Sequence, residues 1–207
     1  MYLRVRSDGT VNITCPPSTS DAEILRFVQG HAGWISGRMQ KIRHKIEAEN
    51  HSFEEGETVR IWGRDLPIEI RHEKPYGAII HGETLVINEP HNSSPQERQA
   101  LFESFRRASL AAAIPEHMVR WQPVLGVNAK SLAIRDMKSR WGSCNCRTGR
   151  LCFNLRLVEK DPKCLEYVVV HELCHLIVPN HSPAFWAEVA KCIPDWKARR
   201  KLTNSTK

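Results

Sequence analysis

The sequence predicts an α+β fold in which helices pack on small sheets, and three observations support this class. Alternating apolar and polar residues mark short strands at the N-terminus and between residues 57 and 88. Two S-x-x-E capping boxes, beginning at Ser20 and Ser94, each open a segment with helical spacing of apolar residues. The 207-residue chain has 41% hydrophobic and 26% charged residues, a globular composition that excludes a disordered or collagen-like chain.

Residues 1–90 are expected to form a β-rich N-terminal subdomain with one long helix. A hairpin is predicted around Asp8-Gly9, because this pair is a turn signal between two alternating runs. The helix is predicted from Ser20 to about Ile46, and its glycines at 30, 33 and 37 are candidate break points. Four β segments between residues 57 and 88 then predict a small antiparallel sheet.

Residues 91–207 are expected to form a second, more helical subdomain, with no long linker before it. A helix is predicted from Ser94 to about Ala113. Two β segments are predicted at Ser131–Ile134 and Arg150–Leu155, with a loop over Lys138–Cys144 between them. Asp161-Pro162 then signals the start of another helix.

Charge and composition limit the partners and the location of the protein. The 30 Lys and Arg residues against 23 Asp and Glu give a net charge of +7, which favours anionic partners such as phosphates or nucleic acid. No run of about 18 apolar residues occurs, which excludes a membrane-spanning helix, and the N-terminus lacks a signal-peptide pattern. Seven cysteines, an odd number, are typical of reduced thiols. We therefore expect a cytoplasmic protein without a membrane partner.

Residues 171–175 have the H-E-x-x-H pattern of a metal site on a helix. Four residues of an α-helix turn about 400°, so His171 and His175 lie one turn apart on the same face and can bind one metal ion. Glu172 is rotated by about 100° from His171, which suits a general base beside the metal. His181 follows shortly after the motif, and three histidine ligands would leave one position open for water, as catalytic zinc requires.

Several alternatives stay open for this site. Glu188 or Asp195 could replace His181 as the third ligand, because other zinc hydrolases place a carboxylate on or after the next helix. Zinc is preferred for a site of three imidazoles, and nickel, cobalt and manganese are the alternatives. The histidines could also make ordinary hydrogen bonds without a metal, although a buried cluster of this kind is costly unless an ion is coordinated.

Further motifs in the same order resemble those of one known family, the YgjP-like metal-dependent hydrolases, which are zincin-like and related to the SprT group. They are Ser139–Cys144 (S-R-W-G-S-C), Asn154-Leu155, Tyr167–Leu176, Asn180–Ser182, Phe185-Trp186 and Pro194-Asp195. The resemblance is close from Ala129 to Leu202 and looser at the N-terminus. It implies a zincin-like metallohydrolase core within residues 91–207, with helices packed on a small mixed sheet, as the catalytic subdomain.

Position by position, the resemblance implies that His171, His175 and His181 bind the metal and that Glu172 is the catalytic base. These assignments agree with those drawn from the motif itself. The family also implies metal-assisted hydrolysis, with a peptide bond as the default target.

Arg140 and Asn154 are the candidate substrate-binding residues. The loop over residues 138–140 carries two cations and a hydroxyl close to Gly142, a residue that permits a tight turn. Arg140 either binds an anion or oxyanion, or is solvated or salt-bridged beside Trp141 as a packing anchor. Asn154 either faces the substrate from a strand edge or satisfies backbone groups.

Two other groups of residues have a functional and a structural interpretation. The thiols of Cys144, Cys146 and Cys152 lack the C-x-x-C spacing of a zinc knuckle, so packing is favoured over a second metal site. The basic tail either forms a solvated helix end or contacts phosphate or nucleic acid. Its cations are Lys197, Arg199, Arg200, Lys201 and Lys207.

Three functions follow from these observations. The first is a zinc-dependent hydrolase with metal-activated water and Glu172 as general base, acting on peptides or proteins as a metallopeptidase. The alternative is a metal-dependent nucleoside triphosphate pyrophosphohydrolase, which the net charge, Lys138 and Arg140 favour. The second alternative is a nucleic-acid-binding module with a structural zinc. It would need a closed four-ligand site and would tolerate Glu172→Gln.

Overall fold

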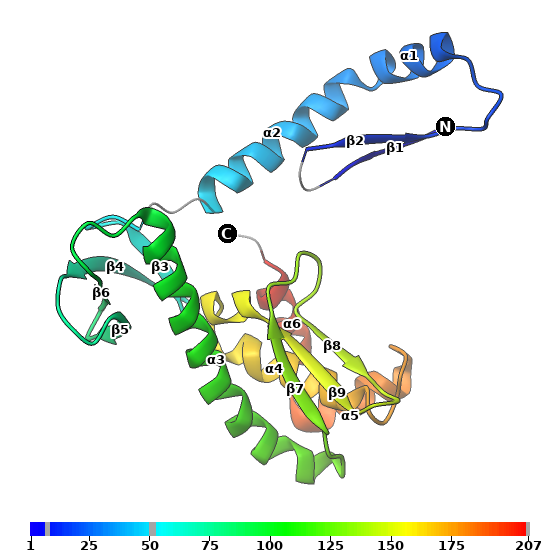
Figure 1. Cartoon of the computed structure of the whole chain (residues 1–207). Helices are drawn as coiled ribbons and strands as arrows, with labels where there is room; N and C mark the ends of the chain where they lie inside the picture. Colours follow the sequence, from blue (N-terminus) through cyan, green and yellow to red (C-terminus); the bar gives the residue numbers. More distant parts are fainter. Residues whose placement is uncertain (7–8, 50–52, 206–207) are drawn as a thin grey trace. The chain divides into compact units, whose positions relative to one another are not determined.

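The computed structural model describes residues 1–6, 9–49 and 53–205, and describes side chains in all of these ranges except 41–49. The chain divides into two compact units, Met1–Ser52 and Phe53–Lys207 (Figure 1). The boundary predicted after residue 90 falls inside the second unit. The strands between residues 58 and 88 therefore share a compact unit with the C-terminal helices.

The first unit consists of a hairpin and two consecutive helices. Strand β1 (Tyr2–Val5) pairs antiparallel with β2 (Val11–Thr14), so the predicted hairpin is confirmed, although its Asp8 lies outside the described residues. The capping box predicted at Ser20 opens α1 (Asp21–Gly30), and α2 (Ala32–Glu49) follows. The helix breaks directly after Gly30, one of the three predicted break points. None of the described side chains in residues 1–40 is buried.

The second unit begins with a four-stranded sheet in the order β3-β4-β6-β5. The prediction of an antiparallel sheet is wrong for one pair, because β4 and β6 run parallel. The hairpin of β5 and β6 folds back so that β6 lies inside the sheet, where Leu85, Val86 and Ile87 are all buried. Such a continuous apolar run is typical of an interior strand. The strands are β3 (Thr58–Ile61), β4 (Arg64–Arg71), β5 (Gly77–His81) and β6 (Thr84–Asn88).

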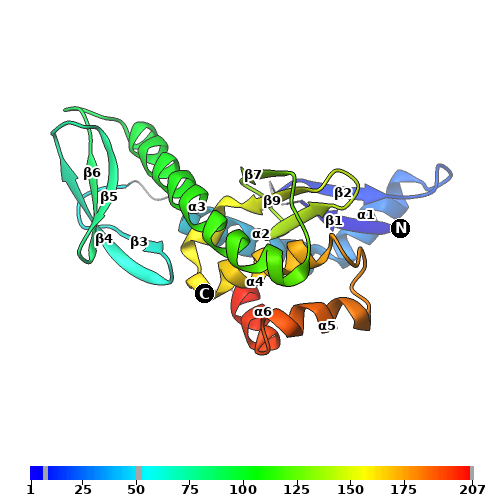
Figure 2. The same ribbon diagram turned by 90° about the horizontal axis from the view of Figure 1, so that it is seen from below.

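Helix α3 (Pro95–Leu125) begins at the predicted capping box and extends past the predicted end near Ala113. It continues through Pro115 and Pro123, although a proline inside a helix removes a backbone hydrogen bond and strains the preceding turn. Its buried residues, Phe102, Leu110, Ile114 and Trp121, lie both before and after Pro115. Tertiary packing therefore keeps the chain helical on both sides of Pro115. Helix α3 runs from the four-stranded sheet towards the three-stranded sheet that follows it in the chain (Figure 2).

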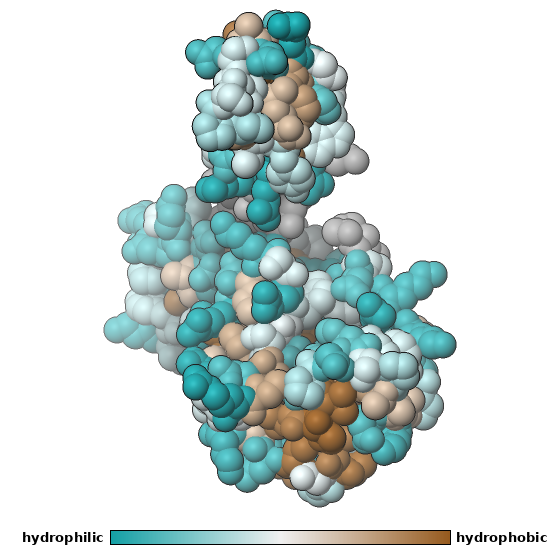
Figure 3. Space-filling view, turned by 90° about the vertical axis from the view of Figure 1, so that its right-hand side faces the viewer, coloured by the Kyte–Doolittle hydropathy of each residue, from teal (hydrophilic) through white to brown (hydrophobic). Residues whose placement is uncertain are grey.

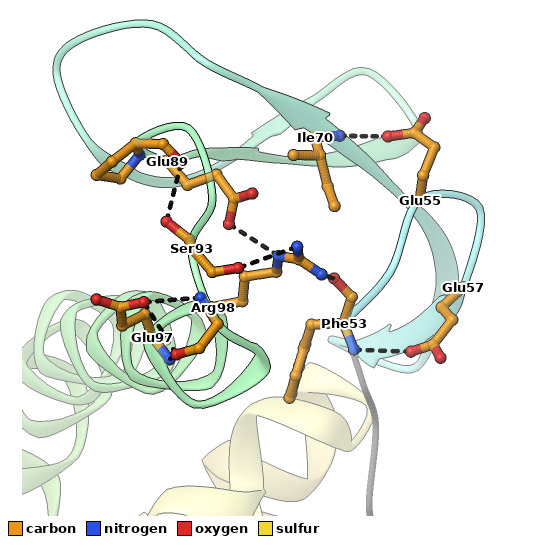
Figure 4. A network of polar contacts seen from close by, with 10 residues as sticks. Phe53, Glu55, Glu57, Ile70, Glu89, Ser93, Glu97 and Arg98 are labelled. Atoms are coloured by element: carbon orange, nitrogen blue, oxygen red, sulfur yellow. Dashed lines mark hydrogen bonds and ion pairs between the residues drawn. The ribbon is translucent and has the colours of Figure 1, made fainter.

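A buried ion pair fastens the start of α3 to the end of β6 (Figure 4). Glu89 is only 1% exposed, and Arg98 Nε donates to its Oε2 at 2.9 Å. The same guanidinium also donates to the backbone carbonyls of Ser93 and Phe53. Because a buried carboxylate is costly without a partner, this pair fixes the position of α3 relative to the sheet.

The second sheet has the order β7-β9-β8, with β7 parallel and β8 antiparallel to β9. Its strands are β7 (Ser131–Arg135), β8 (Gly142–Asn145) and β9 (Arg150–Asn154). The loop predicted over residues 138–144 is thus too long, because β8 starts at Gly142. A short 3-10 helix, η1 (Leu155–Glu159), is followed by three α-helices: α4 (Pro162–Cys174), α5 (Pro183–Cys192) and α6 (Trp196–Asn204).

The predicted α+β class, with helices packed on small mixed sheets, is confirmed. Buried side chains of both sheets, α3, α4 and α5 form one hydrophobic core in the second unit.

Within the described residues, no helix combines the length and the apolar character needed to cross a membrane. Figure 3 shows one face of the molecule with a patch of hydrophobic residues in its lower part. Exposed hydrophobic residues are common on folded domains, so this patch by itself does not indicate a function.

Candidate metal centre

Helix α4 carries the H-E-x-x-H motif up to Cys174, with His175 as its C-cap residue, and the helix starts where the sequence predicts. Asp161 caps the helix by accepting a hydrogen bond from the backbone N–H of Lys163 at 2.8 Å, and Pro162 occupies the first position. The helix is buried over most of its length, with apolar side chains of residues 164–170 in the core. The motif thus lies at the C-terminal end of a helix that is packed into the core.

The three predicted histidine ligands lie together. Nε2 of His171 is 3.0 Å from Nε2 of His181, and one ligand atom from each of His171, His175 and His181 lies within 4.8 Å of the others. Among the described residues, no other His, Cys, Asp or Glu joins this cluster. His181 reaches it from the segment just before α5, where the backbone N–H of Ser182 donates to Asn180 Oδ1 at 3.2 Å.

The two carboxylates considered as a third ligand have other partners. Glu188 Oε1 lies 2.6 Å from Lys191 Nζ, and Asp195 Oδ1 lies 3.0 Å from Arg199 Nε. Neither carboxylate belongs to the histidine cluster. The geometry therefore favours His181 over both.

The protonation of the imidazoles suits a metal ion. His175 Nδ1 lies 3.2 Å from the backbone carbonyl of Val178, so a proton on Nδ1 leaves the Nε2 lone pair free. Burial and the neighbouring His175 and His181 lower the pKa of His171 to about 3, so its ring is neutral at neutral pH. Burial also lowers the pKa of His175. Neutral imidazoles converging on one point are the donor set that zinc prefers, so these residues fit the ion.

Glu172 lies beside the cluster and is only 4% exposed. Burial raises its pKa to about 8, while the positive charge of Arg140 opposes this shift. A cation bound by the histidines would lower the pKa again. A carboxyl group poised near neutral pH can both accept and return a proton, as a general base requires.

Gly142, at the start of β8, makes room for Glu172. A Cβ at position 142 would lie 2.5 Å from Glu172 Oε1 and 2.7 Å from its Cγ, closer than real contacts allow. The expected reason for this glycine, a tight turn, is wrong, because Gly142 is not among the residues with positive φ. The absence of a side chain, rather than an unusual backbone conformation, is what the site requires here.

Aromatic side chains of α5 support the imidazoles, a role that the sequence interpretation missed. The buried Phe185 ring lies 4.8 Å from His171, 4.5 Å from His175 and 4.9 Å from His181, measured between ring centroids. Trp186 stacks on His181 at 5.6 Å. The available signal was the position of this aromatic pair, directly after the proposed third ligand on the next helix.

The cluster opens into a pocket of about 650 Å³. Tyr167 lines it, and burial raises the pKa of this phenol to about 12, so the hydroxyl stays protonated. Its ring packs 5.8 Å from that of His171. Glu172 is the only carboxylate among the described residues that line this pocket.

Arg140 and Asn154, the two predicted substrate residues, have different positions. Arg140 lines the pocket, as a substrate contact would. Asn154 is 3% exposed and does not line it. Its Nδ2 donates to the carbonyls of Met137 and Arg140, and its Oδ1 accepts from the N–H of Arg156 at 3.1 Å. The structure therefore favours the alternative for Asn154, which is to satisfy backbone groups and hold the loop that carries Arg140.

Arg199 and Arg200, which the sequence interpretation treated together as part of the basic tail, have different surroundings in the structure. Arg199 pairs with Glu166 of α4 and with Asp195, so it is part of the packing of α6. Arg200 instead lines the pocket, with its Cζ 4.9 Å from the centre of the Trp186 ring. Lys207 lies outside the described residues.

The cysteines near the site are free thiols in the structure. Cys144 and Cys146 line the pocket, and the Cys146 thiol donates to the carbonyl of His175 with an S···O distance of 3.1 Å. Burial, with Cys146 close by, raises the pKa of Cys144 to about 12. The hydrogen bond of Cys146 and the burial of Cys144 are those of packed thiols.

Comparisons with known proteins point to one family. The family model described as a YgjP-like, metallopeptidase domain matches residues 1–206. No curated protein matches the chain. Among solved structures, the metallopeptidase zymogen abylysin of Pyrococcus abyssi is similar with 22% identity and a TM-score of 0.39, over 42% of this chain and 91% of that one. The zymogen jannalysin of Methanocaldococcus jannaschii is similar with 24% identity and a TM-score of 0.36, over 44% of this chain and 89% of that one. Scores this low carry no argument about the fold or activity of the chain.

Proposed function

Because the chain belongs to the YgjP-like family of metallopeptidase domains, we propose that it is a single-zinc peptidase with Glu172 as its general base. The observation that carries the proposal is the convergence of His171, His175 and His181, with one ligand atom of each within 4.8 Å of the others. Glu172 lines the same pocket. Three protein ligands beside an open pocket are typical of catalytic zinc, whereas structural zinc has four.

The residues have separate roles in this reaction. Zinc, when bound, polarises the scissile carbonyl and makes a water molecule nucleophilic at neutral pH. Glu172 takes the proton from the attacking water and returns it to the leaving amine. His175 is oriented through Val178, and Phe185 packs against all three imidazoles, so the ligands are held before the ion arrives.

Hydrolysis of a nucleoside triphosphate is the second candidate function. Arg140 and Arg200 both line the pocket, and a cationic pocket suits a phosphate chain. Lys138, which the sequence interpretation counted with Arg140, is not among the residues that line it. The family match supports a peptide rather than a nucleotide as the substrate.

The test of the proposal is turnover by the zinc-loaded protein on peptide and nucleoside triphosphate panels in parallel. Glu172→Gln should retain one zinc ion and lose peptide turnover by about 10²-fold to 10⁴-fold, the usual contribution of a general base. Glu188→Gln is the matched control, because Glu188 pairs with Lys191 outside the histidine cluster. Full peptide turnover in Glu172→Gln would exclude this carboxylate as the base. Turnover of nucleotides alone would replace the peptide proposal with the second candidate.

A further inference from the structure

Two arginines of the pocket have no role in the proposed peptide hydrolysis as described so far. Arg140 precedes β8 by two residues, and Arg200 lies in α6, so they reach the pocket from different elements. The same pocket is lined by His171 and Glu172. Both cations therefore lie close to the place where a substrate would react.

The side chain of Arg200 and the backbone of Arg140 each have a neighbour that positions them. The guanidinium of Arg200 stacks on Trp186, which itself stacks on Trp196 with 4.2 Å between the ring centroids. Stacking of this kind leaves the N–H groups at the edge of the guanidinium available to an anion. The backbone carbonyl of Arg140 accepts from Asn154 Nδ2 at 2.8 Å, which fixes the loop that carries this side chain.

Arg140 and Arg200 differ from Arg199 in their ion pairs. Arg199 pairs with Glu166 and Asp195, whereas within the described part of the chain no carboxylate forms an ion pair with Arg140 or Arg200. Glu172 is the one acidic residue of the described pocket lining, against the two guanidinium groups of Arg140 and Arg200. The pocket therefore has a positive charge that the protein itself does not balance.

We propose that Arg140 and Arg200 form a carboxylate subsite that selects peptide substrates with an acidic group next to the cleaved bond. The guanidinium fork matches a carboxylate in shape and charge, and such hydrogen bonds are among the strongest in proteins. The proposal rests on the proposed peptidase function. An acidic side chain and the C-terminal carboxylate of the peptide share this chemistry, and the substrates below separate these two sources.

The test uses matched fluorogenic peptides that differ only in Glu or Gln beside the cleaved bond, each with a free or an amidated C-terminus. The zinc-loaded protein should prefer the acidic member of one pair by about 10-fold to 100-fold in kcat/KM, the range expected for hydrogen bonds to a charged group. Arg140→Gln and Arg200→Gln should bring this ratio close to one, mainly through KM. Lys201→Gln, an exposed residue of α6 outside the pocket lining, is the matched control and should keep the preference.

A binding measurement separates the subsite from the peptidase function. Zinc-loaded Glu172→Gln should bind the uncleaved acidic peptide more tightly than its amide twin in calorimetry, and adding Arg200→Gln should remove the difference. If the wild type cleaves all peptides without preference, the carboxylate subsite is wrong and the peptidase proposal stands. If the protein binds the acidic peptide preferentially but the wild type does not cleave it, the subsite is supported and the peptidase proposal is wrong. If no peptide binds with preference, and a nucleoside triphosphate binds and loses affinity in Arg200→Gln, the arginines recognise phosphate and the carboxylate proposal is wrong.

Discussion

Gly142 and Glu172 occupy adjoining space so closely that no side chain fits between them: a Cβ on Gly142 would lie 2.5 Å from Glu172 Oε1. The Glu172 side chain of helix α4 therefore packs directly against the backbone of strand β8 at this point. The buried carboxylate of Glu172 is held against β8 on one side and beside His171 along its own helix. The position of the proposed base thus depends on a glycine in another element.

Gly142→Ala should displace Glu172 while leaving the three histidines in place. We expect zinc stoichiometry to stay at the wild-type value and kcat to fall by about 10²-fold, because small errors in the position of a catalytic group cost that much. Gly37→Ala is the control, because an added Cβ at Gly37 meets nothing within 4 Å. Wild-type activity in Gly142→Ala would show that Glu172 tolerates displacement and is not the positioned base.

Phe185→Ala should weaken the metal site as well as the fold. Removing this buried ring lowers the free energy of unfolding by about 3–5 kcal/mol. Because Phe185 packs against all three imidazoles, zinc affinity should also fall, by about 10-fold to 100-fold. Val189→Ala, a buried residue of the same helix without ring contacts to the histidines, should lose stability only. Equal zinc affinity in both variants, measured by competition with a chelator, would contradict the supporting role of Phe185.

Glu166 links three helices, and its contribution to stability should depend on pH. Its carboxylate on α4 pairs with Arg199 of α6 and accepts from Trp121 Nε1 of α3 at 3.1 Å. Burial alone would raise the pKa of Glu166, but the hydrogen bonds from Arg199 and Trp121 lower it on balance. The stabilisation is therefore complete above the unfolded pKa of about 4.3 and is lost as the pH falls through the folded pKa.

Glu166→Gln should lower the free energy of unfolding by about 1–3 kcal/mol at pH 7, with a smaller difference from the wild type at pH 3. Denaturant unfolding at the two pH values measures the change. Glu103→Gln, an exposed residue of α3, is the control and should have little effect at either pH. A Glu166→Gln difference that is equal at pH 7 and pH 3 would exclude ionisation as its source.

Arg98→Met should destabilise the second unit strongly, because it leaves the carboxylate of Glu89 buried without its partner. Removing one member of a buried ion pair costs about 3–5 kcal/mol. The double variant Glu89→Gln and Arg98→Met should regain part of this stability, since no buried charge remains. Urea unfolding of the two variants measures the difference, and a double variant less stable than Arg98→Met would contradict this account of the pair.

The clustering of the three histidines could be predicted from the sequence, because helical geometry fixes the relation between His171 and His175, and the break after the helix brings His181 back to them. The sequence did not predict that β4 lies beside β6 or that α3 continues through Pro115. Both depend on tertiary packing, which outweighs local propensity. The role of Gly142 and the pocket position of Arg200 were missed for a related reason. A glycine that admits a neighbouring side chain, or one arginine among several, has no local signal in the sequence.

The proposed peptidase requires that one zinc ion binds to His171, His175 and His181 with no fourth protein ligand. Anomalous diffraction from crystals of the zinc-loaded protein tests it most directly. We predict one zinc peak at about 2.0–2.1 Å from a nitrogen of each imidazole, with the remaining coordination open to the pocket. A zinc ion bound by a fourth protein side chain, or by Glu188 or Asp195 in place of His181, would contradict the account.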